Sequence, residues 1–121
     1  MATPNIVAVA TINGFTLSGA ATTSDVDIIN VPSDYIYKIN TFMVSNIDSV
    51  NTATVSIKIS TNAGTTFYEF GPAIPIPPKT VLTFIGKDNI IYLDETDYLR
   101  ISASASGDLV YYCGGEKMYT S

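Results

Sequence analysis

The sequence contains no histidine and no tryptophan, and only one of its 121 residues is a cysteine. Without an imidazole, the chain lacks the commonest general base and the commonest transition-metal ligand of proteins. A serine or cysteine nucleophile would have no histidine beside it to accept its proton. A single cysteine cannot form an internal disulfide, so cross-links do not hold the domain together. These absences predict a protein that is not an enzyme and that uses no cofactor.

Long apolar runs are absent as well. No run approaches the roughly 20 residues that are needed to span a bilayer. The first ten residues contain no lysine or arginine and no convincing cleavage site, so they make a poor signal peptide. We therefore expect no membrane partner, and we expect the chain to be made in a cytoplasm.

Charged residues are scarce, at 14 % of the chain, and they give a net charge of −5. Binding to nucleic acid requires clustered lysine and arginine, whereas the six basic residues are scattered along the sequence. We expect no nucleic-acid partner. A surface that is poor in charge is left to Ser, Thr, Asn and Tyr, which suits a protein that is covered by another protein.

Alternation of polar and apolar residues predicts strands at residues 53–60 and 97–104, each with one buried face. Residues 35–45 alternate less cleanly, and their apolar side switches near Phe42, which indicates a bulge or a strand buried on both faces. Shorter strands are expected at 5–11, 26–31, 66–70, 80–85, 90–93 and 109–113. Turn residues separate these segments, among them Asn13-Gly14 and Ser106-Gly107-Asp108. The sequence therefore predicts an all-β chain, a single-domain antiparallel β-sandwich or jelly roll.

Residues 71–78 contain four prolines, which cannot lie in a central strand because each removes a hydrogen-bond donor from the ladder. We interpret this stretch as an extended connection between two sheets. A rigid polyproline-like docking arm is the less favoured alternative.

Residues 1–12 form an apolar segment that we interpret as an N-terminal arm or an edge strand, followed by a β-sandwich domain at residues 13–121. An arm of this kind could pair with the exposed sheet edge of a neighbouring molecule. Tyrosine is enriched in protein interfaces, and Tyr98 lies on the polar face of its predicted strand, where we expect it to be exposed. The candidate interface residues are Ile6, Val7, Val9, Tyr98, Arg100 and Tyr119.

Two acidic groups are candidates for cation binding. The turn Asp94-Glu95-Thr96-Asp97 offers several oxygen ligands but lacks the spacing of an EF-hand loop, so we favour an ordinary solvated turn. Asp25 and Asp27 lie on one face of a strand, where they would repel each other unless a cation or a lysine lies between them. Neither group predicts a metal site.

Several segments follow one another in a familiar order: VPSDYIYKIN at residues 31–40, IPIPPKTVL at 74–82, IYLDETDYLRISAS at 91–104 and LVYY at 109–112. This series resembles the small β-sandwich structural proteins of tailed bacteriophages, of the head decoration (cement) or neck and tail type, over roughly residues 25–118. The sequence departs from that family at residues 113–119 (CGGEKMY), which puts its C-terminal contacts in doubt.

The resemblance implies a virion component, whose partners would be the major capsid protein or other virion proteins. Our leading hypothesis is a capsid decoration protein that binds capsomer junctions as a homo-oligomer, with a trimer favoured. A neck, collar or tail component is the first alternative. A carbohydrate-binding or adhesin module with exposed tyrosines is an alternative of another class, and a hydrolase with two suitably spaced carboxylates is the third.

Overall fold

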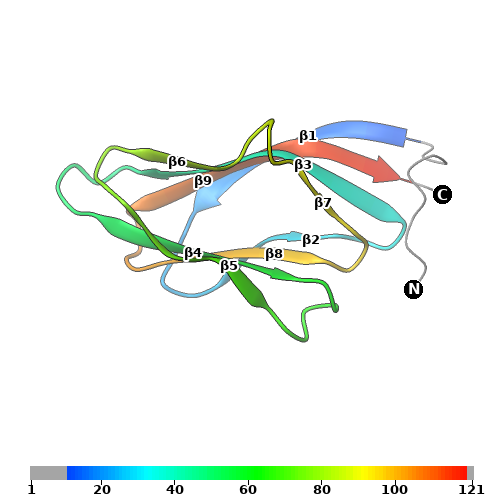
Figure 1. The fold of residues 1–121 in the computed structure, drawn as a ribbon, viewed down its shortest axis with the longest axis horizontal. Helices are drawn as coiled ribbons and strands as arrows, with labels where there is room; N and C mark the ends of the chain where they lie inside the picture. The colour runs from blue at the N-terminus through cyan, green and yellow to red at the C-terminus, as the bar shows by residue number, and fades with distance from the viewer. Residues whose placement is uncertain (1–10, 120–121) are drawn as a thin grey trace.

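The computed structural model describes residues 11–119, which form nine β-strands and no helix (Figure 1). The strands are β1 (Thr11–Ala20), β2 (Val26–Asn30), β3 (Tyr35–Asn46), β4 (Ala53–Ser60), β5 (Tyr68–Ile76), β6 (Val81–Ile85), β7 (Ile91–Leu93), β8 (Tyr98–Ala103) and β9 (Leu109–Tyr119). Within this range, a search for a helix able to cross a membrane finds none.

The strands form two antiparallel sheets that lie over one another as layers (Figure 1). Sheet A has the order β1-β9-β3-β6, with β7 also paired to β3, and sheet B has the order β2-β8-β4-β5. The pairing is nested, since β1 pairs with β9, β2 with β8, β3 with β6 and β4 with β5. This is the strand arrangement of a jelly roll, in which a long hairpin is rolled into a two-sheet sandwich. The predicted fold class is confirmed.

The core lies between the two sheets and contains the side chains that strand alternation predicts to face inward. Val55 and Ile57 from β4 pack with Leu99 and Ile101 from β8, and all four are fully buried. Sheet A contributes Phe42 from β3 and Leu109 from β9. Because the inward residues of both sheets are aliphatic or aromatic, their burial supplies the main favourable term in folding.

A bulge divides β3 at the place where its apolar pattern changes. The pairing of β3 with β9 shifts register between Ile39 and Thr41, and β3 pairs with β7 before this point and with β6 after it. Gly115 of β9 lies opposite the bulge, and a Cβ atom there would overlap the carbonyl oxygen of Lys38. The bulge therefore requires glycine at position 115.

Three local expectations need correction. Asn13-Gly14 is not a turn, because both residues lie inside β1 and pair with Lys117 and Glu116 of β9. Residues 71–76 are not a connection: they continue β5 along the edge of sheet B, and only residues 77–80 cross to sheet A. An edge strand tolerates proline, because its outward N–H groups have no partner in the sheet. The last strand also runs to Tyr119 rather than ending at Cys113.

We expect Gly115→Ala to lower the free energy of unfolding by about 2 kcal/mol or more, because the new methyl group must displace backbone rather than a flexible side chain. Gly14→Ala is the matched control. It lies in the neighbouring strand, and its Cβ would meet only the carbonyl oxygen of Gly115, at 3.9 Å. Urea denaturation curves of the two variants measure the difference, and equal midpoints would contradict this account of the bulge.

Candidate functional site

The acidic turn between β7 and β8 lines a surface pocket of about 430 Å³ together with residues 61–63. Two of its carboxylates are buried and hold backbone groups. Glu95 Oε2 accepts a hydrogen bond from the N–H of Asp34 at 2.7 Å, and Asp97 Oδ2 accepts one from the N–H of Asp94 at 2.8 Å. Burial raises the pKa of Asp97 above its usual value, and the charge of Asp94 acts in the same direction.

The expectation of an ordinary solvated turn is therefore wrong for Glu95 and Asp97, which are buried. One oxygen of each carboxylate accepts a hydrogen bond from a backbone N–H group, in the β2–β3 connection for Glu95 and in the β7–β8 connection for Asp97. Among residues 11–119, no group of three or more potential ligands of the His, Cys, Asp and Glu types is placed to hold a metal ion. The turn is best understood as a structural element that joins two loops.

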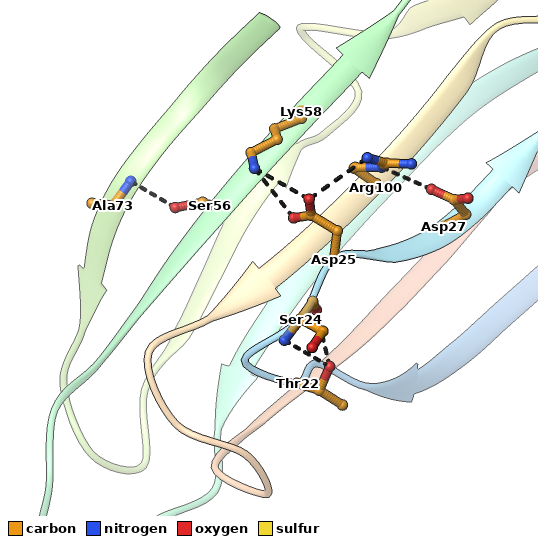
Figure 2. Close-up of polar contacts among 8 residues, drawn as sticks. All are labelled: Thr22, Ser24, Asp25, Asp27, Ser56, Lys58, Ala73 and Arg100. Atoms are coloured by element: carbon orange, nitrogen blue, oxygen red, sulfur yellow. Dashed lines mark hydrogen bonds and ion pairs between the residues drawn. The ribbon is translucent and has the colours of Figure 1, made fainter. Parts of the chain in front are cut away.

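A charged network covers part of the outer face of sheet B (Figure 2). Asp25 accepts from Lys58 Nζ at 3.2 Å and lies 3.6 Å from Arg100, and Arg100 Nε donates to Asp27 at 2.8 Å. Arg100 contacts both carboxylates and so offsets the repulsion expected between them, whereas Lys58 contacts Asp25 alone. Such partly exposed pairs contribute little stability, but they cancel the charge of this face.

The predicted interface residues within the described range all make contacts inside the chain. Tyr98 is half-buried rather than exposed, and its ring meets Phe67 edge-on with centroids 5.8 Å apart. The guanidinium of Arg100 lies 3.6 Å from the centre of the same Phe67 ring. Tyr119 packs on Tyr35 at 4.8 Å between ring centroids. Their interface role stays a prediction, and Ile6, Val7 and Val9 lie outside the described residues.

The outer face of sheet A carries exposed apolar side chains that the sequence reading missed. The exposed fractions are 58 % for Ile12, 55 % for Tyr92, 54 % for Val81 and 40 % for Tyr112. Tyr92, Val81 and Tyr112 each have an inward-facing neighbour on their strand, so these three point away from the core. By alternation along β1, Ile12 lies on the same side of the sheet as Ser18, which pairs with Tyr112. We call these four residues, with the half-buried Met43 and Val110, the sheet A face.

The sheet A face is nearly free of charge. Tyr112 lies between Ser18 of β1 and Met43 of β3 in the cross-strand register, and Val110 lies between Ala20 and Ser45. The ion pair recorded on this face joins Lys38 Nζ and Glu116 Oε1 at 3.7 Å. The sequence hides this surface, because its members come from five strands and gather only when the sheet forms.

Cys113 is fully buried within the core between the sheets. Burial raises the pKa of its thiol to about 12. Since the thiolate is the reactive form, this cysteine is an inert core residue.

No protein-family model matches the sequence, and no curated protein matches it either. A solved structure described as "Bacillus endospore appendages form a novel family of disulfide-linked pili" is 14 % identical, with a TM-score of 0.57 over 92 % of this chain and 88 % of that chain. A pentameric capsid protein from metagenomic phage sequences is 15 % identical, with a TM-score of 0.45 over 86 % of this chain and 61 % of that one. The Drosophila NLP core is 12 % identical, with a TM-score of 0.47 over 87 % of this chain and 96 % of that one.

At these identities, the likeness to the spore appendage protein shows the fold alone. The other two structures superpose too loosely to carry an argument about this chain.

We expect Glu95→Ala to lower the free energy of unfolding by about 1–2 kcal/mol, because it removes the acceptor of the Asp34 N–H bond. Glu95→Gln is the matched control, since its amide oxygen can still accept, and it should cost less. Thermal unfolding of both variants, with and without 1 mM calcium chloride as an added probe, tests the structural role. Stabilisation of the unmodified chain by calcium, lost in Glu95→Gln, would instead identify a cation site.

Cys113 should not react with Ellman's reagent at pH 8 in the folded protein, because so little thiolate forms when the pKa is about 12. Unfolding in guanidinium chloride restores an ordinary thiol and should release one equivalent of the coloured product per chain. Rapid reaction of the native protein would show that Cys113 is accessible and that the burial described above is incorrect.

Proposed function

We propose that this chain is a non-enzymatic structural subunit that works by binding other protein chains, and more specifically a capsid decoration protein of a phage head. The observation that carries the proposal is the sheet A face. It is an exposed apolar surface on a domain that has a complete core of its own.

Exposed apolar area of this kind is typical of protein interfaces, because covering it releases water at little polar cost. Tyr92 and Tyr112 add rigid rings with a polar tip, which is the chemistry that interface hot spots favour. The outer face of sheet B differs, since Lys58 and Arg100 neutralise two carboxylates there, those of Asp25 and Asp27. The two faces thus suit different surroundings, one in contact with protein and the other with water.

The fold alone does not decide between an assembly subunit and another function, since jelly rolls occur both in viral capsid proteins and in lectins. The spore appendage protein that shares the fold forms disulfide-linked pili. This chain has one cysteine, Cys113, which is buried, so it cannot be cross-linked by disulfides to two neighbours. Contacts between this chain and two neighbours at once would therefore be non-covalent on at least one side.

The decoration role itself rests on the sequence resemblance to tailed-phage structural proteins. In this form of the proposal, the sheet A face binds the major capsid protein at capsomer junctions, and a homotrimer sits on a three-fold position of the virion. A neck, collar or tail position is the alternative within the virion, and it is distinguished by copy number per particle. Mass spectrometry of purified particles would give hundreds of copies for decoration and a dozen or fewer for a neck.

The sheet A face can be tested with one substitution and a matched control. Tyr112→Glu places a charge in the middle of the face, and Tyr68→Glu places the same charge on the exposed Tyr68 of β5, on sheet B. We expect Tyr112→Glu to weaken binding to heads stripped of this protein by about 30-fold or more, as loss of an interface hot spot does. Tyr68→Glu should bind as the unmodified chain does.

Equal binding by both variants would contradict the proposal that this face is the interface. A carbohydrate-binding module is the alternative of another class, because exposed tyrosines also stack on sugar rings. Specific binding on a glycan array, abolished by Tyr112→Glu, together with no binding to heads, would favour that module over a structural subunit.

A further inference from the structure

We propose that the outer edge of β1 accepts an added β-strand, and that residues 5–10 of a second copy of this chain supply it. This inference deepens the proposed function, because it rests on the chain being a subunit and names the contact between copies. It does not depend on what the sheet A face binds.

The outer edge of β1 pairs with no strand of the described part of the chain. Its ten residues pair with β9 in an unbroken register from Thr11 to Ala20, and no strand among residues 11–119 lies on its other side. Just beyond the strand, Ala21 N–H donates to the carbonyl of Leu109 at 2.9 Å. This bond shows which residues of β1 direct their backbone groups toward β9. In an antiparallel pair, every second residue bonds to the partner and the others point away. The outward set is therefore Ile12, Gly14, Thr16, Ser18 and Ala20.

The other edges of the two sheets are protected, and β1 is not. At the far edge of sheet B, β5 contains Pro72 and Pro75, and Ala73 between them has a positive φ of 43°. The opposite edge strand, β2, has five residues and a register shift between Asp27 and Ile29. In sheet A, β6 and β7 are five and three residues long. Prolines, bulges and short strands are the usual means by which proteins prevent edge-to-edge pairing.

None of these protective features occurs in β1. Its sequence, TINGFTLSGA, has no proline and no charged residue, and its pairing shows no register shift. A strand with these properties is a ready template for another strand. An edge of this kind on a stable domain indicates a site of strand addition.

The length and composition of the chain before β1 fit that site. Residues 5–10 would span about 20 Å as an extended strand, which is enough to cover six of the ten residues of β1. Residues 6–10 read Ile-Val-Ala-Val-Ala, an uncharged sequence in which three of the five residues are β-branched and favour strands. It contains none of the Gly, Asn, Asp or Pro residues that a tight turn requires.

The missing turn decides which copy supplies the strand. To pair with its own β1, the chain would have to reverse direction between residues 6 and 11, where no turn residue is present. A second copy can supply the same segment with no reversal. Each copy then gives one strand and accepts one, a head-to-tail contact that closes into a ring when the rotation between copies permits.

The test uses proline on each partner in the full-length chain, with alanine at the same position as control. Thr16→Pro removes an outward N–H of β1 without removing a bond to β9, whereas Thr16→Ala keeps that N–H. In the donor segment, a Val7→Pro and Ala8→Pro double variant removes donors on both sides of the added strand, and Val7→Ala is its control. Native mass is measured by light scattering after size exclusion, and circular dichroism checks that each variant is folded.

We expect the unmodified chain and both alanine variants to form the same oligomer. Both proline variants should run as the 13.0 kDa monomer, and a synthetic peptide of residues 1–12 should dissociate the oligomer. If Thr16→Pro does not fold, the donor variant and the peptide still decide the outcome.

Three results would overturn the inference: an unmodified chain that is monomeric, a folded Thr16→Pro that stays oligomeric, or a donor variant that stays oligomeric. The last result together with a monomeric Thr16→Pro would show instead that two β1 edges pair directly. An oligomer that fails to bind phage heads would overturn the decoration role and leave this inference intact. If the unmodified chain is a monomer and binds phage heads, the inference is overturned and the decoration role is supported.

Discussion

The bulge in β3 is the constraint on which the arrangement of sheet A depends. The register of β3 with β9 shifts between Ile39 and Thr41, and on its other side β3 pairs with β7 up to Ile39 and with β6 from Phe42. A single strand thereby joins three neighbours, with β9 along its other side. The shift is possible only because β9 presents Gly115 where the backbone of β3 comes closest. The same arrangement sets which side chains of β3, β7 and β9 reach the outer surface, and so it defines the sheet A face.

The two sheets differ in the polarity of their outer faces and in the regularity of their edge strands. Sheet B carries neutralised charges on its outer face and a proline-bearing strand at its edge, where Tyr68 is exposed. Sheet A carries several exposed tyrosine and aliphatic side chains on its outer face and the regular strand β1 at its edge. Apolar faces and open edges are costly for a free protein, because both favour aggregation. Only sheet A combines an apolar outer face with a regular edge strand among the described residues.

Strand alternation predicted most of the fold, because burial of one face leaves a period of two in the sequence. It located the core positions Val55, Ile57, Leu99 and Ile101, and it placed the irregularity of β3 close to its true position. It failed where residues that favour a turn lie in a segment that pairs with another strand. Asn13-Gly14 is a strong turn signal, but ten pairs with β9 outweigh it. The sheet A face was beyond sequence reading, since Tyr92 and Tyr112 meet on one surface only through a nested pairing that no local pattern encodes.

Cys113 gives the domain a practical property that follows from its position. Because the one native thiol is buried between the sheets with a pKa of about 12, a cysteine introduced at an exposed position would be the one accessible thiol for maleimides near neutral pH. Fluorophores, spin probes or heavy-atom clusters could then be attached at chosen points without first removing the natural cysteine. If the chain coats a larger particle, its symmetry would repeat each attached group in a regular array over the surface.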